Sequence, residues 1–125
     1  MTGIVLGEVV ATTATTGPST ATVSIGADEP VLAGHFPDFP IFPGVCVVEC
    51  VHRGARLTAP AEAGRVRLVA MESVRWLAPV FPGDTLTITV DWRGEDPTWW
   101  CTGQASTASG VAAVVRLRYQ AGAAR

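Results

Sequence analysis

The chain has 125 residues and a net charge of -2, and 48% of its residues are hydrophobic while only 16% are charged. This length suits one domain over residues 1–125, and the slightly acidic balance argues against a nucleic acid partner. So small a charged fraction predicts that another subunit covers some apolar surface, and we expect a homodimer or a higher oligomer.

The three cysteines argue against a secreted disulfide framework, because their number is odd and two of them lie four residues apart in one apolar run. The first 14 residues contain Glu8 and no basic residue, so they do not resemble a signal peptide. No run approaches the length of a membrane span. We therefore expect a cytoplasmic protein without a membrane partner.

The first predicted elements form a hairpin. Residues 3–12 are rich in Ile, Leu and Val and predict a strand, the sequence Gly17-Pro18-Ser19 predicts a turn, and residues 20–25 predict a second strand.

A proline-rich stretch follows, and residues 34–44 read Gly-His-Phe-Pro-Asp-Phe-Pro-Ile-Phe-Pro-Gly. Proline fixes φ and pushes the preceding residue toward extended geometry, so three prolines within seven residues predict a stiff, irregular loop. The loop starts with His35 and leads into an apolar run that contains one carboxylate, Glu49. A histidine and a carboxylate beside a buried surface are sufficient to act as a general base and a general acid in proton transfer.

Residues 45–51 have the β propensity of a valine-rich run, yet three features favour a helix. Pro43-Gly44 can serve as the helix entry, residues 52–57 are helix-compatible, and the pattern ends before Pro60. A helix that is apolar all round its first two turns must be wrapped by other structure.

The rest of the chain predicts four strands, at residues 65–77, 85–93, 98–107 and 111–119. The second of these alternates strictly, which places Leu86, Ile88, Val90 and Trp92 on one face. One helix can cover a sheet of this size only if the sheet curls round it. The predicted fold class is therefore α+β, with a curled antiparallel sheet of about six strands wrapped around one long central helix.

Residues 34–45, together with Glu49, resemble the signature of the β-hydroxyacyl-acyl carrier protein dehydratases, which have the hot dog fold. The resemblance rests on the H-F-P-x-x-P core, the later P-G-V, the spacing from His35 to Glu49 and a second turn, Val-Phe-Pro-Gly-Asp, at residues 80–84. With the strand order it covers most of the chain. The chain departs from the pattern after Glu49, where Cys50-Val51-His52-Arg53 stands in place of A-M-A-Q, and no P-H-R-Y-P-F-like stretch precedes the first strand. We expect such a divergent, short member in a polyketide or polyene pathway, or in fatty acid biosynthesis.

The resemblance implies dehydration of a (3R)-3-hydroxyacyl-acyl carrier protein thioester to the trans-2-enoyl thioester. This reaction needs a base at C2, an acid for the departing hydroxyl and donors for the thioester oxygen. His35 suits the base, and Glu49 suits the acid because burial among neighbouring valines would favour its protonated form. The free backbone N–H groups of Gly44 and Val45 at the helix start suit the thioester carbonyl.

The resemblance also implies a site shared across a dimer, with His35 of one subunit facing Glu49 of the other. A tunnel lined by Phe36, Phe42 and the helix would take the acyl chain. The acyl group would arrive on the phosphopantetheine arm of an acyl carrier protein, and no metal or other cofactor is implied. Five arginines are candidates for docking that acidic carrier: Arg53, Arg56, Arg65, Arg67 and Arg75.

Other interpretations stay open beside these. Glu49 could form an i,i+4 salt bridge with Arg53, although its expected burial argues against this. Cys46 and Cys50 with His52 could bind a metal, but packing fits one helical pair better, and Trp92, Trp99 and Trp100 suit a core or an interface. At the level of function, the alternatives are a hot dog thioesterase and a non-catalytic dehydratase-like subunit of a heterodimer.

Overall fold

The computed structural model describes residues 8–12, 18–26 and 42–121. Residues 34–41 of the proline-rich loop, with His35 and Phe36, lie outside the described residues, as do residues 3–7 of the first predicted strand. The elements are β1 (Val10–Thr12), β2 (Ser19–Ser24), α2 (Gly44–Leu57), a 3₁₀ helix (Ala61–Ala63), β3 (Val66–Trp76), β4 (Thr85–Glu95), β5 (Thr98–Thr107) and β6 (Gly110–Ala121). Within the described ranges, the predicted strands and the predicted helix are confirmed; the short 3₁₀ helix was not predicted.

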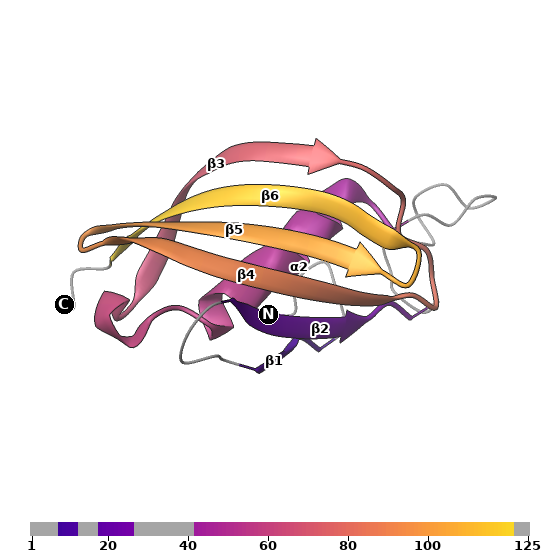
Figure 1. Ribbon diagram of the computed structural model, residues 1–125, viewed down its shortest axis with the longest axis horizontal. Helices are drawn as coiled ribbons and strands as arrows, with labels where there is room; N and C mark the ends of the chain where they lie inside the picture. Colours follow the sequence, from indigo (N-terminus) through magenta and orange to yellow (C-terminus); the bar gives the residue numbers. More distant parts are fainter. Residues whose placement is uncertain (1–7, 13–17, 27–41, 122–125) are drawn as a thin grey trace.

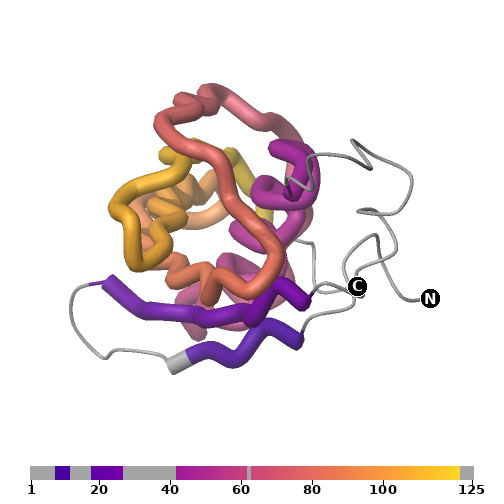
Figure 2. The backbone as a smooth tube through the Cα atoms, turned by 90° about the vertical axis from the view of Figure 1, so that its right-hand side faces the viewer, coloured from indigo at the N-terminus to yellow at the C-terminus, as the bar shows by residue number. Residues whose placement is uncertain are grey.

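The strands form one antiparallel sheet with the order β1-β2-β4-β5-β6-β3 (Figure 1). The sheet curls, and α2 lies on its concave side, as the view along the sheet in Figure 2 shows. The predicted architecture is confirmed. Among the described helices, none is long and apolar enough to cross a membrane.

Helix α2 begins directly after Pro43, whose own backbone is extended. Pro43 has φ -63° and ψ 148°, and its carbonyl accepts hydrogen bonds from the N–H groups of Cys46 (2.9 Å) and Val47 (3.2 Å). At the other end the Thr58 hydroxyl donates to the carbonyl of Gly54 at 2.8 Å. A valine-rich run becomes helical here because packing of one apolar face outweighs a small loss in intrinsic propensity.

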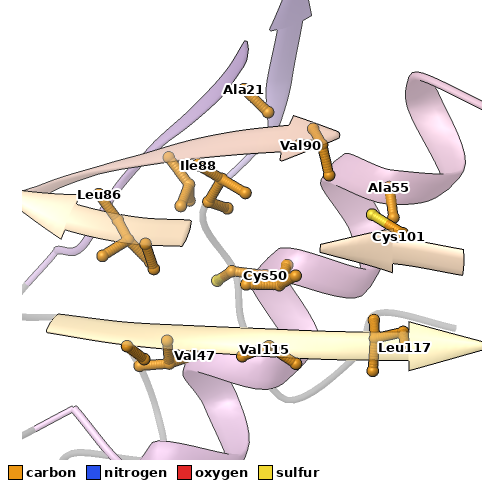
Figure 3. Close-up of a cluster of buried hydrophobic side chains, with 14 of the residues drawn as sticks. Ala21, Val47, Cys50, Ala55, Leu86, Ile88, Val90, Cys101, Val115 and Leu117 are labelled. Carbon is orange, nitrogen blue, oxygen red and sulfur yellow. The ribbon is translucent and has the colours of Figure 1, made fainter. Parts of the chain in front are cut away.

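The buried side of α2 packs against the concave face of the sheet (Figure 3). The strict alternation of β4 is confirmed, since Leu86, Ile88 and Val90 are each 1% exposed or less. All three cysteines are buried within this core and form no disulfide: Cys46, Cys50 and Cys101. Packing is therefore the role of Cys46 and Cys50, as the sequence favoured.

The helix lies very close to the sheet at one glycine of β5. A Cβ atom built at Gly103 would lie 2.5 Å from Cγ1 of Val51, which is fully buried. Only a residue without a side chain leaves room for Val51 at this point. Gly103 therefore sets how closely α2 packs onto the middle of the sheet.

We expect Gly103→Ala to lower the free energy of unfolding by about 1–3 kcal/mol, because the added methyl group has to displace Val51 or the helix backbone. Urea denaturation of the purified protein measures this loss. The matched control is Thr102→Ala, since Thr102 precedes Gly103 on the same strand and is exposed. Equal stability of the two variants would contradict the assigned role of Gly103.

Candidate active site

The start of α2 presents unpaired backbone donors. Within the part of the chain that the structure describes, the N–H groups of Gly44 and Val45 donate no hydrogen bond, and no side chain caps the helix. The first turn contains no acidic residue. Free amides and the positive end of the helix dipole favour an oxygen that carries negative charge. The predicted donor role of these two residues is compatible with this geometry.

A hydrophobic pocket of about 540 Å³ lies on the sheet side of the helix start. Phe42 and Gly44, two of the predicted substrate-binding residues, both line it. Val45 does not line it, and its side chain is 66% exposed. The remaining lining residues are Val47, Trp76, Leu77, Ala78, Pro79, Val80, Ala112 and Ala113.

Glu49 lies on the opposite side of the helix from the sheet, and its expected burial among valines is wrong for this chain. The Glu49 side chain is 32% exposed, and its Oε2 lies 2.7 Å from Nε of Arg53. The helical repeat of 3.6 residues explains the difference, because it groups Glu49 with the exposed residues Val45 and Arg56, away from the buried positions. The i,i+4 salt bridge, which the sequence argument disfavoured, is present. The helix is likewise not covered all round in this chain.

His52 forms a hydrogen bond that the sequence did not predict. Its Nδ1 lies 2.7 Å from the hydroxyl oxygen of Tyr119 on β6, and the two rings stack with centroids 5.7 Å apart. Burial lowers the pKa of His52; Glu49 opposes this change, whereas Arg56 and Arg53 add to it. Burial also raises the pKa of Tyr119 above its ordinary value. The lowered pKa favours the neutral imidazole, whose tautomer decides whether Nδ1 donates to the Tyr119 hydroxyl or accepts from it.

The same network continues to β4. The ring of Trp92 lies 5.0 Å from that of Tyr119, and its Nε1 donates to the Thr58 hydroxyl at 3.3 Å. These contacts attach the second half of α2 to β4 and β6.

The sequence signal that could have indicated these contacts is the departure at Cys50–Arg53, where a histidine stands three residues after Glu49. Its partner Tyr119 is 67 residues away in the chain, so spacing alone could not identify it.

The five candidate docking arginines differ in exposure. Arg53 is held by Glu49 and is 25% exposed, whereas the others are exposed: Arg56, Arg65, Arg67 and Arg75. Among the described residues, no group of three or more His, Cys, Asp and Glu side chains is arranged to bind a metal ion.

Residues 11–114 match the family described as "ApeI-like: ApeI dehydratase". The chain is 44% identical over 72 residues to the 3-hydroxyacyl-acyl-carrier-protein dehydratase FabZ of Desulforamulus reducens, an overlap of 54% of this chain and 51% of that protein. The chain thus spans about half the length of the curated relatives that it matches.

Two solved structures show the fold. The dehydratase heterocomplex ApeI:P from Xenorhabdus doucetiae superposes with a TM-score of 0.68 at 21% identity, over 83% of this chain and 88% of the other. An acyl-CoA hydrolase from Staphylococcus aureus superposes with a TM-score of 0.66 at 19% identity, over 88% and 69% of the two chains. The predicted hot dog fold is confirmed.

We expect His52 to make stability depend on pH. Because its pKa in the folded protein lies below 6.5, the unfolded chain binds the proton more readily. The contribution of His52 to stability is complete above pH 6.5 and is lost as the pH falls through the folded pKa. Urea denaturation from about pH 8 to about pH 5 should show a steeper loss for the wild type than for His52→Gln.

The control for this experiment is His35→Gln, because the chain has two histidines. The His35 variant should keep the wild-type slope. If the free energy of unfolding falls with pH at the same rate in the wild type and in His52→Gln, the pKa of His52 does not differ between the folded and unfolded protein.

Proposed function

Because the chain belongs to the ApeI-like dehydratase family, we propose that it removes water from a (3R)-3-hydroxyacyl thioester carried by an acyl carrier protein and forms the trans-2-enoyl thioester. The observation that carries this proposal is the family match over residues 11–114. The helix start supports it, since free amides adjoin a hydrophobic pocket of a size that suits a small-molecule substrate. We propose that the protein acts in the cytoplasm, in the biosynthesis of fatty acids or polyketides.

In the proposed reaction His35 takes a proton from C2 while the amides of Gly44 and Val45 hold the negative charge that develops on the thioester oxygen. The C3–O bond breaks, and the hydroxyl leaves as water after receiving a proton. Because Arg53 holds the Glu49 carboxylate at 2.7 Å, we infer that Glu49 orients a water molecule that gives its proton to the leaving hydroxyl and regains one from solvent. Solvent then takes up the proton that His35 removed from C2, so the net change is the loss of one water molecule from the acyl group.

The proposed site is shared between two copies of the chain, with His35 of one facing Glu49 of the other. Strand β3 supports a second copy, since it forms one end of the described sheet and spans 11 residues. It also carries exposed large apolar side chains, as the low charged content led us to expect: Leu68, Val69, Met71 and Trp76. An exposed apolar edge of this length favours pairing with another chain.

A heterodimer is the alternative assembly, because the neighbour from Xenorhabdus doucetiae was solved as a heterocomplex. A thioesterase is the alternative activity, because the Staphylococcus aureus neighbour with the same fold is an acyl-CoA hydrolase. The two activities differ in their products: a dehydratase removes water from the acyl group, whereas a thioesterase releases the thiol.

We expect His35→Ala and Glu49→Gln each to lower the turnover of a 3-hydroxyacyl-acyl carrier protein by on the order of a hundredfold or more. Mass spectrometry of the carrier measures the loss of water and separates it from release of the acyl group. Circular dichroism checks that each variant is folded.

The matched control for Glu49→Gln is Glu72→Gln, since both carboxylates are 32% exposed and both pair with arginine. Glu72 pairs with Arg116 and Arg118 on neighbouring strand β6. The control should retain full turnover. Full turnover in either active-site variant would remove that residue from the proposed mechanism.

A mixed dimer tests whether the site is shared. One subunit carries His35→Ala, the other carries Glu49→Gln, and two different affinity tags isolate the mixed species. If His35 and Glu49 act across the interface, one of the two sites is intact, and the dimer should show about half of the wild-type activity. An inactive mixed dimer would place both residues of a working site in one chain.

A further inference from the structure

Trp76, the last residue of β3, lies directly over the start of α2. A Cβ atom built at Gly44 would lie 2.8 Å from Cη2 and 2.9 Å from Cζ2 of the Trp76 indole. The ring therefore occupies the space that a side chain at position 44 would need. About half of the ring faces outward, since Trp76 is 54% exposed, while it also lines the pocket.

Backbone hydrogen bonds hold the wall of the pocket around Trp76. The N–H of Phe42 donates to the carbonyl of Val80 at 2.7 Å, which ties the segment before the helix to the segment after β3. The N–H groups of Leu77 and Ala78 both donate to the carbonyl of Ala112, at 2.8 and 3.2 Å. The wall is thus fixed by main-chain contacts, and Trp76 is its largest side chain.

The chemistry of the lining selects an uncharged, aliphatic occupant. None of the described lining residues carries a charge, and three of them are alanines, at positions 78, 112 and 113. Among the described residues, these small side chains near the indole leave room in the pocket. Each methylene group that enters such a space leaves water, which favours binding of an aliphatic chain.

We propose that Trp76 determines the length of the acyl chain that this protein accepts. The inference rests on the proposed function, in which the amides of Gly44 and Val45 hold the thioester carbonyl. The acyl tail then enters the adjacent pocket, in which the indole beside Gly44 limits the room for the tail. A longer tail has to move Trp76 away from Gly44 or leave methylene groups in water, so kcat/KM falls as the tail becomes longer.

The test compares kcat/KM for 3-hydroxyacyl-acyl carrier proteins of increasing length in the wild type, Trp76→Ala and Ala78→Leu. Trp76→Ala should raise the ratio of long-chain to short-chain kcat/KM on the order of tenfold, the factor that about two further buried methylene groups provide. Ala78→Leu should lower the same ratio, because Ala78 lines the pocket and is exposed enough to accept a larger side chain. The matched control is Leu57→Ala, which truncates a side chain that is 55% exposed at the far end of α2 and outside the lining.

Calorimetry with unreactive alkyl amides of pantetheine separates this inference from the proposed function. If the wild type shows no dehydration but Trp76→Ala binds long alkyl chains more tightly, the proposed function fails and the role of Trp76 stands. If dehydration occurs while neither kcat/KM ratios nor affinities change with chain length in Trp76→Ala, the role of Trp76 is overturned. An equal shift in Leu57→Ala would also overturn it.

Discussion

The structure depends on the close contact between one helix and the concave face of the sheet. The run from Val45 to Val51 would be an unremarkable buried strand in another context, and it is helical here because the curled sheet covers one of its sides. The contact has a strict steric condition, since Val51 packs where Gly103 has no side chain. Gly54 of the helix meets the sheet in a similar way, with Cβ of Ala21 3.2 Å from the position its own Cβ would take. Small residues on both surfaces therefore set the depth at which the helix lies.

Because α2 packs onto the sheet along one side, the helix has two sides with different proposed functions. The side toward the sheet contributes Gly44 and Val47 to the hydrophobic pocket, while the outer side carries Glu49 and its partner Arg53. The backbone N–H groups of Gly44 and Val45 lie at the N-terminal end of the helix, between these two sides. A substrate bound there would have its apolar tail against the sheet and its reactive carbons toward the outer side. This arrangement is the reason that a second subunit is part of the proposed site, because the described residues of one copy leave Val45 and Arg56 on the outer side of the helix exposed.

Much of the fold was predictable because its strands alternate clearly and its turns contain glycine or proline, as at Leu86 to Val90 and Pro82-Gly83. The exposure of Glu49 was not predictable in the same way. The neighbouring valines predict burial on every side, whereas the helical repeat turns Glu49 outward. The pair of His52 and Tyr119 joins residues 67 positions apart, and the contact of Trp76 with Gly44 joins a strand end to a helix start. Contacts of this kind follow from how elements pack, which the order of residues in one chain does not specify. The proline-rich loop remains a prediction from the sequence, as do the roles of His35 and Phe36.

The burial of the cysteines has a chemical consequence for a protein proposed to handle thioesters. A thiolate exchanges readily with a thioester and would capture the acyl group from its carrier, whereas a protonated thiol does not. Burial raises the pKa of the Cys101 thiol to about 12, with a smaller contribution from Asp91. Cys46 and Cys50 have no exposed surface either. Sulfur atoms thus fill the space between helix and sheet without acting as competing nucleophiles, so in the proposed reaction the acyl group stays on its carrier.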